Sequence, residues 1–189
     1  MTTNLLHRME GEKIFFKALD INDAPEIHCY ASDKEVSRFI GWRLMNNLDE
    51  TGQHVEEMLK REAAGTHFYA SVVERTNHTI IGTAMLFNID KEAKHAEIGY
   101  VLHRDCWGRG YGTEVVELVK KIAFEDLELH KLHARVADAN AGSCRILEKN
   151  GFVLEGRLKD YYFIEERYYD GLFYGCISSE NKILLNIKT

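Results

Sequence analysis

The chain has 189 residues, of which 45% are hydrophobic and 29% charged, with a formal net charge of −6. This balance predicts one globular domain over residues 1–189, and the acidic charge does not favour a nucleic-acid partner. The four cysteines are widely spaced without a C-x-x-C pair, which indicates neither a zinc ribbon nor a redox dithiol. Because no apolar run has the length of a signal peptide core or of a membrane span, we expect a cytoplasmic protein with no membrane partner.

The first half of the chain predicts a strand, two helical regions and a meander of strands. A strand is expected at 13–19, and a helical region from 24 to about 39 is expected to break near residues 32 and 33. The segment 49–64 repeats apolar residues at helical spacing and ends at Gly65. Three strand-like segments follow, with joints short enough for hairpins: 66–75, 79–88 and 95–103.

The second half alternates helices and strands. A helix is expected at 111–129, a strand at 131–138, and a short helix at 140–150 with Asn140 as its N-cap and Gly151 after its end. Two more strands are expected at 152–162 and 167–177. The order β, α, α, β, β, β, α, β, α, β, β indicates an α/β (α+β) fold with a mixed sheet and an antiparallel meander in its middle.

Three glycines, Gly108, Gly110 and Gly112, stand at the mouth of the predicted helix in the stretch HRDCWGRGYGTEVVE. Glycines let the backbone turn sharply, and the unpaired N–H groups of a first helical turn form an anion site suited to a phosphate. The spacing matches neither a P-loop nor a dinucleotide fingerprint. By itself the stretch is equally compatible with a glycine-rich helix entry that binds nothing.

The segment EIGYVLHRDCWGRGYGTEVVELVKKIAFEDLELHKLHARVADANAGSCRILEKNGFVLEG resembles the acetyl-CoA-binding core of the GNAT N-acetyltransferase superfamily. In the family pattern [QR]-x-x-G-x-[GA], Gly110 and Gly112 fill the small-residue positions and Trp107 replaces the usual Gln or Arg. That departure resembles the W-G-[KR]-G-Y-[AG]-T-E variant of the branch that acetylates the N-terminal alanine or serine of ribosomal proteins. The same branch is matched by N-x-x-S at Asn140 and Ser143, by LEKNGF, by EG at 155–156 and by YYD at 168–170.

The resemblance covers about residues 12–178 and implies a GNAT-like fold. That fold has about seven mostly antiparallel strands, a splay between the fourth and fifth, and about four flanking helices. The resemblance also implies acetyl-CoA as cosubstrate and no metal. The pyrophosphate would lie on the N–H groups of residues 108–113, the pantetheine would pair with the backbone near Tyr100 to Leu102, and Asn140 would contact the arm. The predicted coenzyme-binding residues are Tyr100, Val101, Leu102, Trp107, Gly108, Arg109, Gly110, Tyr111, Gly112, Thr113, Asn140 and Ser143.

The resemblance also guides the choice of catalytic residues. A primary amine is mostly protonated at pH 7, so its attack on a thioester needs a base, and Glu97 is the candidate, acting through water. The alternative carboxylate position of some relatives is occupied by Arg135. Where many relatives have a tyrosine that protonates the leaving thiolate, this chain has Leu147, so Ser143 is the candidate donor.

The expected acceptor is a small-molecule or peptide amine, best matched by a protein N-terminal α-amine. A polyamine and an amino sugar or antibiotic are alternatives, a non-catalytic acyl-CoA-binding sensor is an alternative of another class, and a homodimer is left open. Four carboxylates crowd the last predicted hairpin, where they either solvate a turn or attract a cationic amine: Asp160, Glu165, Glu166 and Asp170.

Overall fold

A seven-stranded sheet forms the centre of the computed structural model, which describes residues 5–178. The strand order is β1-β2-β3-β4-β5-β7-β6, and every neighbouring pair is antiparallel except β4 and β5, which are parallel. The predicted mixed, mostly antiparallel sheet is therefore confirmed. The strands are β1 (Ile14–Lys17), β2 (His67–Glu74), β3 (Ile80–Asp90), β4 (His95–Leu102), β5 (Lys131–Ala137), β6 (Val153–Ile164) and β7 (Arg167–Ile177).

The α-helices of the described residues are α1 (Ala24–Ala31), α2 (Lys34–Ser37), α3 (Leu48–Ala63), α4 (Tyr111–Lys121) and α5 (Ala141–Lys149). The expected break after α1 is confirmed, because Asp33 caps α2 by accepting a hydrogen bond from the N–H of Glu35. The long helix expected at 111–129 is α-helical only as far as Lys121 and ends in a π-helical turn. Within residues 5–178, no helix is both long and apolar enough to cross a membrane.

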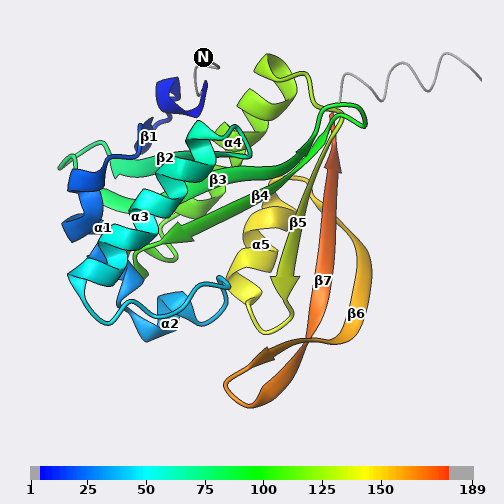
Figure 1. Ribbon diagram of the computed structural model, residues 1–189. Helices are drawn as coiled ribbons and strands as arrows, with labels where there is room; N and C mark the ends of the chain where they lie inside the picture. The colour runs from blue at the N-terminus through cyan, green and yellow to red at the C-terminus, as the bar shows by residue number, and fades with distance from the viewer. Residues whose placement is uncertain (1–4, 179–189) are drawn as a thin grey trace, which may run out of the picture.

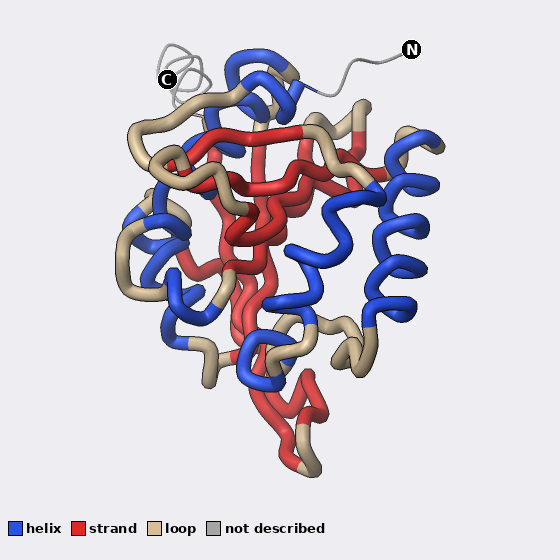
Figure 2. The backbone as a smooth tube through the Cα atoms, turned by 90° about the vertical axis from the view of Figure 1, so that its left-hand side faces the viewer, coloured by secondary structure: helices blue, strands red, loops and turns tan. Residues whose placement is uncertain are grey.

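Helices cover both faces of the sheet (Figure 2). The apolar side chains of α4 and α5 pack on one face, and those of α1, α2 and α3 pack on the other. Strand β2 shows how the alternation of a strand divides residues between the two cores, since Val72 belongs to the first and Val73 to the second. Both side chains are nearly inaccessible to solvent.

The sheet opens between its two parallel strands. Strands β4 and β5 pair at only three positions, from His95 opposite Lys131 to Glu97 opposite His133, and then diverge (Figure 1). The predicted splay is thus confirmed. Strand β5 stays paired with β7 along its whole length, so the opening lies only on the side that faces β4.

Candidate active site

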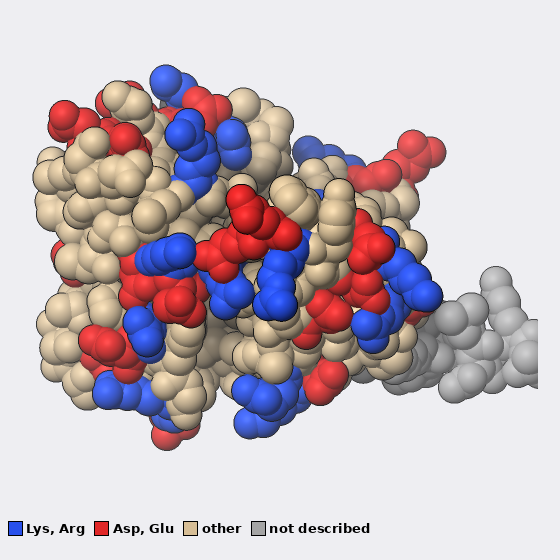
Figure 3. Space-filling view, turned by 90° about the horizontal axis from the view of Figure 1, so that it is seen from below, with Lys and Arg blue, Asp and Glu red and all other residues tan. Residues whose placement is uncertain are grey.

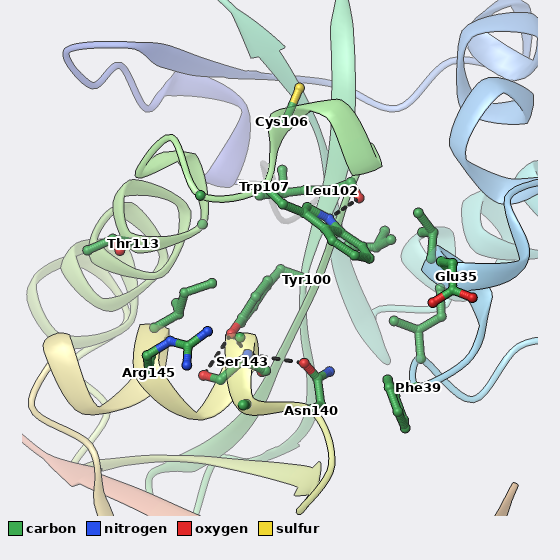
Figure 4. A pocket seen from close by; sticks show the side chains of 18 of the residues that line it. Glu35, Phe39, Tyr100, Leu102, Cys106, Trp107, Thr113, Asn140, Ser143 and Arg145 are labelled. Atoms are coloured by element: carbon green, nitrogen blue, oxygen red, sulfur yellow. Dashed lines mark hydrogen bonds between the residues drawn. The ribbon is translucent and has the colours of Figure 1, made fainter.

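A cavity of about 510 Å³ lies at the splay (Figure 4). Its walls come from the end of β4, the glycine-rich loop, the first turns of α5, and α2 with the residues that follow it. Of the residues expected from sequence, the cavity brings together Tyr100, Val101, Leu102, Trp107, Gly108, Gly110, Gly112, Thr113, Asn140 and Ser143. The cavity lining does not include Glu97, Arg109 or Tyr111.

The glycine-rich loop is shaped by backbone conformation and by packing. Gly110 is the N-cap of α4 and has φ of +89°, in the left-handed region that side chains disfavour. A Cβ at Gly112 would lie 2.6 Å from Cδ1 of Ile146 on α5. The loop is also tied to the N-terminal part of the chain, because Lys13 Nζ donates to the carbonyl of Arg109 at 3.1 Å. The missing side chain of Gly112 thus leaves room for the end of the Ile146 side chain between α4 and α5.

Tyr111 turns away from the cavity. Its side chain is buried and its hydroxyl donates a hydrogen bond to a carboxylate oxygen of Glu74 on β2, which raises the pKa of the phenol. The side chain of Tyr111 is therefore not part of the cavity wall, and its sequence-based role would be limited to its backbone N–H group.

Trp107 occupies part of the open edge of β4. The N–H of His103 donates to the carbonyl of Ile81 in β3, so by the alternation of a strand the peptide groups of Leu102 and Tyr100 point toward β5. The carbonyl of Leu102 already accepts a hydrogen bond from Trp107 Nε1 at 2.9 Å. The N–H and carbonyl groups of Tyr100 also face the opening, but they do not make this hydrogen bond with Trp107. They are therefore the backbone groups of the predicted pantetheine site that a ligand can pair with.

Two hydroxyl groups meet on the cavity wall (Figure 4). Asn140 caps α5 by accepting from the N–H of Ser143 at 3.1 Å, and the hydroxyls of Ser143 and Tyr100 lie 2.8 Å apart. Burial raises the pKa of Tyr100, so its phenol stays protonated at neutral pH. The sequence interpretation used only the backbone of Tyr100. Strand alternation was the available signal, because it places Tyr100 on the same face as Ile98 and Leu102, the face that α5 covers.

Glu97 lies at the vertex of the splay, on the opposite face from Tyr100. Arg135 holds its carboxylate through Nε to Oε1 at 2.8 Å and through Nη2 to Oε2 at 3.1 Å, and Asn88 donates to Oε2 at 2.9 Å. A carboxylate offers about four acceptor sites, so these contacts leave about one, on Oε1. His133 Nε2 is 3.7 Å from Oε2, and burial lowers the pKa of this imidazole. The ion pair raises the pKa of Arg135.

The cavity lining also includes Glu35 and Phe39 at the α2 side, and Arg145 and Lys149 on α5. The charged residues among them, Glu35, Arg145 and Lys149, were not expected from the sequence. The two cations are four residues apart on a predicted helix, and this spacing was the signal that could have found them. No comparable signal existed for α2, which reaches the cavity only through the packing of the fold. Within residues 5–178, no group of three or more His, Cys, Asp or Glu side chains is arranged to hold a metal ion.

The carboxylates of the last hairpin are partly neutralised. Glu165 pairs with Lys34 and Arg38, and Asp170 pairs with Arg157. Basic and acidic side chains also alternate over the lower face of the molecule (Figure 3). These pairs neutralise part of the acidity that the four carboxylates give the hairpin.

Comparison with known proteins places this site in a family. The family model described as an acetyltransferase (GNAT) domain matches residues 13–153. The probable N-acetyltransferase YjcK of Bacillus subtilis (strain 168) is 33% identical over 153 residues, covering 78% of this chain and 84% of the relative. The spermidine N(1)-acetyltransferase of Vibrio cholerae is 25% identical over 160 residues, covering 85% and 90%. The structure of a ribosomal-protein-S5-alanine acetyltransferase from Vibrio fischeri has a TM-score of 0.78 at 24% identity, covering 91% and 97%. The resemblance seen in the sequence is thereby confirmed, and the chain belongs to the GNAT family of N-acetyltransferases.

Proposed function

We propose that this N-acetyltransferase moves an acetyl group from acetyl-CoA to a primary amine by direct attack of the amine on the thioester. The observation that carries the proposal is the cavity at the splay. One wall of that cavity consists of a helix N-terminus with glycine backbone, and the adjoining wall carries the cations Arg145 and Lys149. Exposed N–H groups beside two cations form a site for phosphate groups.

In this proposal the N–H groups of residues 108–113 and the side chains of Arg145 and Lys149 hold the phosphates. The open peptide group of Tyr100 receives the pantetheine as an added strand. Such an arrangement fixes the thioester between β4 and β5, and much of the acceleration comes from that positioning.

The residues of the vertex and the cavity wall handle two protons. The amine nitrogen bonds to the acetyl carbon after losing a proton through water to Glu97, whose Oε1 keeps one acceptor site. When the carbon–sulfur bond breaks, Ser143 donates its hydroxyl proton to the thiolate. The phenol of Tyr100, 2.8 Å away, returns a proton to Ser143. The second proton of the attacking nitrogen passes through water to the phenolate of Tyr100, so the products are the N-acetylated amine and free thiol.

Two acceptor classes have specific support. The W-G-R-G-Y-G-T-E stretch supports a protein N-terminal α-amine, as in the ribosomal-protein branch. The name of the Vibrio cholerae relative and the carboxylate of Glu35 in the cavity wall support a polyamine. An amino sugar or antibiotic has no comparable observation in its favour.

The test is a screen of amines that measures release of free thiol from acetyl-CoA. The panel contains peptides with N-terminal alanine or serine, aliphatic monoamines and polyamines, and aminoglycosides. We expect turnover with at least one primary amine, and a large loss of turnover in Ser143→Ala. Calorimetric binding of acetyl-CoA without thiol release with any amine would instead identify a non-catalytic acyl-CoA sensor.

A further inference from the structure

The charges of the cavity are separated between two of its walls. Only three lining residues of the described chain are charged: Arg145 and Lys149 on α5, and Glu35 on α2. Arg145 and Glu35 lie on opposite sides of the cavity (Figure 4). The cationic side suits the phosphates of the coenzyme, which leaves the side with Glu35 for the acceptor. The acceptor therefore approaches along a wall that carries one negative charge.

The charge of Glu35 depends on a contact from another part of the chain. Its neighbours in and after α2, Lys34 and Arg38, are both cationic and would outweigh it. Glu165 pairs with both of them, since its carboxylate lies 3.2 Å from Lys34 Nζ and 2.9 Å from Arg38 Nε. No side-chain hydrogen bond or ion pair within the described residues engages the carboxylate of Glu35. Glu165 thus balances one excess cation and leaves Glu35 available to a ligand.

Further contacts hold the hairpin of β6 and β7 against α2. Arg38 Nη2 donates to the hydroxyl of Tyr169 at 3.3 Å, and the rings of Phe39 and Tyr169 meet edge to face with centroids 6.1 Å apart. Both α2 and the hairpin tip reach the lower end of the molecule (Figure 1). Since Phe39 lines the cavity, the hairpin supports the acceptor wall from outside.

The turn of this hairpin is strained. Glu165 and Glu166 form a two-residue turn between the paired residues Ile164 and Arg167, and their φ values are +49° and +60°. Turns of this kind favour Asn and Gly, because a side chain is costly in the left-handed region. Strain of this kind is a reason to look for a function. The reach of Glu165 to Lys34 and Arg38 supplies that function.

We propose that Glu35 selects acceptor amines that carry a second positive charge, namely aliphatic diamines and polyamines, and that Glu165 is a positioning residue for this selection. The inference rests on the proposed function. The reacting amine must be neutral to attack the thioester, so a carboxylate at the acceptor wall favours an ammonium group elsewhere in the same molecule. A monoamine or a peptide with a single N-terminal amine offers no such group.

The first experiment compares acceptors that differ by one charge. The acceptors are propylamine, 1,3-diaminopropane, spermidine and a neutral peptide with N-terminal alanine, at saturating acetyl-CoA. Glu35→Gln should lower kcat/KM for the diamine and for spermidine about 5- to 10-fold, as expected for one partly exposed charge pair. The loss should come through KM, with kcat unchanged and propylamine affected less than about 2-fold.

The second experiment separates contact from general charge. Glu165→Gln frees Lys34 and Arg38, so it should also raise KM for the diamine, and adding Lys34→Gln to that variant should restore most of the loss. Glu166→Gln is the matched control, because it removes the same charge from the neighbouring residue. The carboxylate of Glu166 makes no hydrogen bond or ion pair among the described residues. Glu166→Gln should leave the diamine KM unchanged.

Three results would overturn the inference. If the wild-type enzyme had a higher kcat/KM for the peptide or for propylamine, diamines and polyamines would be excluded as the preferred acceptors. An equal loss with all acceptors in Glu35→Gln would remove its role in selection. An equal rise of the diamine KM in Glu165→Gln and Glu166→Gln would show that the overall negative charge of the hairpin acts on the acceptor, and that Glu165 does not position Glu35. Absence of acetyl transfer to every amine would instead contradict the proposed function itself.

Discussion

In the proposed mechanism, the contact of Tyr100 with Ser143 takes the place of the tyrosine that many relatives have at position 147, where Leu147 lies in the core. Ser143→Ala should lower kcat by roughly 10²-fold, the usual effect of losing a general acid. Tyr100→Phe should lower kcat by less, because the hydroxyl of Ser143 remains. Steady-state thiol release at saturating acetyl-CoA measures both. A Ser143→Ala variant with the kcat of the parent would remove Ser143 from the chemistry.

Glu97 is the residue at which a catalytic role and a structural role need to be separated. Glu97→Gln should lower kcat, most clearly at low pH, where less of the amine is neutral. It should lower the free energy of unfolding by only about 1 kcal/mol, because the side chain of Arg135 that loses its partner is 37% exposed to solvent. Arg135→Met is the matched control, because it breaks the same pair but keeps the carboxylate. Thermal unfolding and pH–rate profiles of both variants are the measurements. Parallel losses of kcat in the two variants would assign Glu97 to structure alone.

At the scale of elements, the packing of α4 on α5 shapes the coenzyme wall. Gly112→Ala places a methyl group 2.6 Å from Cδ1 of Ile146, so the end of that side chain must shift, and the free energy of unfolding should fall by no more than about 1 kcal/mol. Because Ile146 lines the cavity, the same shift should weaken coenzyme binding. Ile146→Val should recover part of both losses in the double variant. Denaturant unfolding and calorimetry of the four variants in the cycle test this, and strictly additive effects would show that the two side chains do not meet.

Elements that depend on local pattern were predictable. Strands with alternation, the cap at Asn140 and the glycines around α4 all carry their information within a few residues of sequence. The pair of Glu97 and Arg135 could not be predicted, because its members are 38 positions apart and meet only where two parallel strands stop pairing. The contribution of α2 to the cavity could not be predicted either, because it also depends on contacts between distant parts of the chain. Which distant side chains meet depends on tertiary packing, and the periodicity of a single segment carries no information about it.

At the scale of the whole molecule, partly buried histidines predict sensitivity to acid. Burial lowers the pKa of His54, His67 and His133 below the ordinary value of 6.5. Below about pH 6.5 the unfolded chain then binds more protons than the folded one, so the free energy of unfolding should decrease as the pH falls through that value. Carboxylates with lowered pKa, such as Asp90 and Asp170, contribute their loss only at lower pH.

His54 offers the clearest test, because its Nε2 is buried without a hydrogen-bond partner within the described residues and its ring packs against Trp42. His54→Phe keeps the ring contact and removes the titration, so it should flatten the decrease in stability between about pH 7 and 5.5. Urea unfolding at several pH values measures the slope. A slope equal to that of the parent would show that His54 does not contribute.

The splay has a consequence for mechanics and for heat resistance. Only three pairs of the strand ladder join β4 to β5 in the described sheet, so the two halves of the sheet, β1 to β4 and β5 to β7, meet along a short line. A ligand that adds a strand there bridges the two halves, so hydrogen exchange at the amide of Tyr100 should slow when coenzyme A is present. The same binding adds about 2.7 kcal/mol of stability at a concentration 100 times the Kd. The melting temperature of this enzyme is therefore expected to rise with the concentration of free coenzyme.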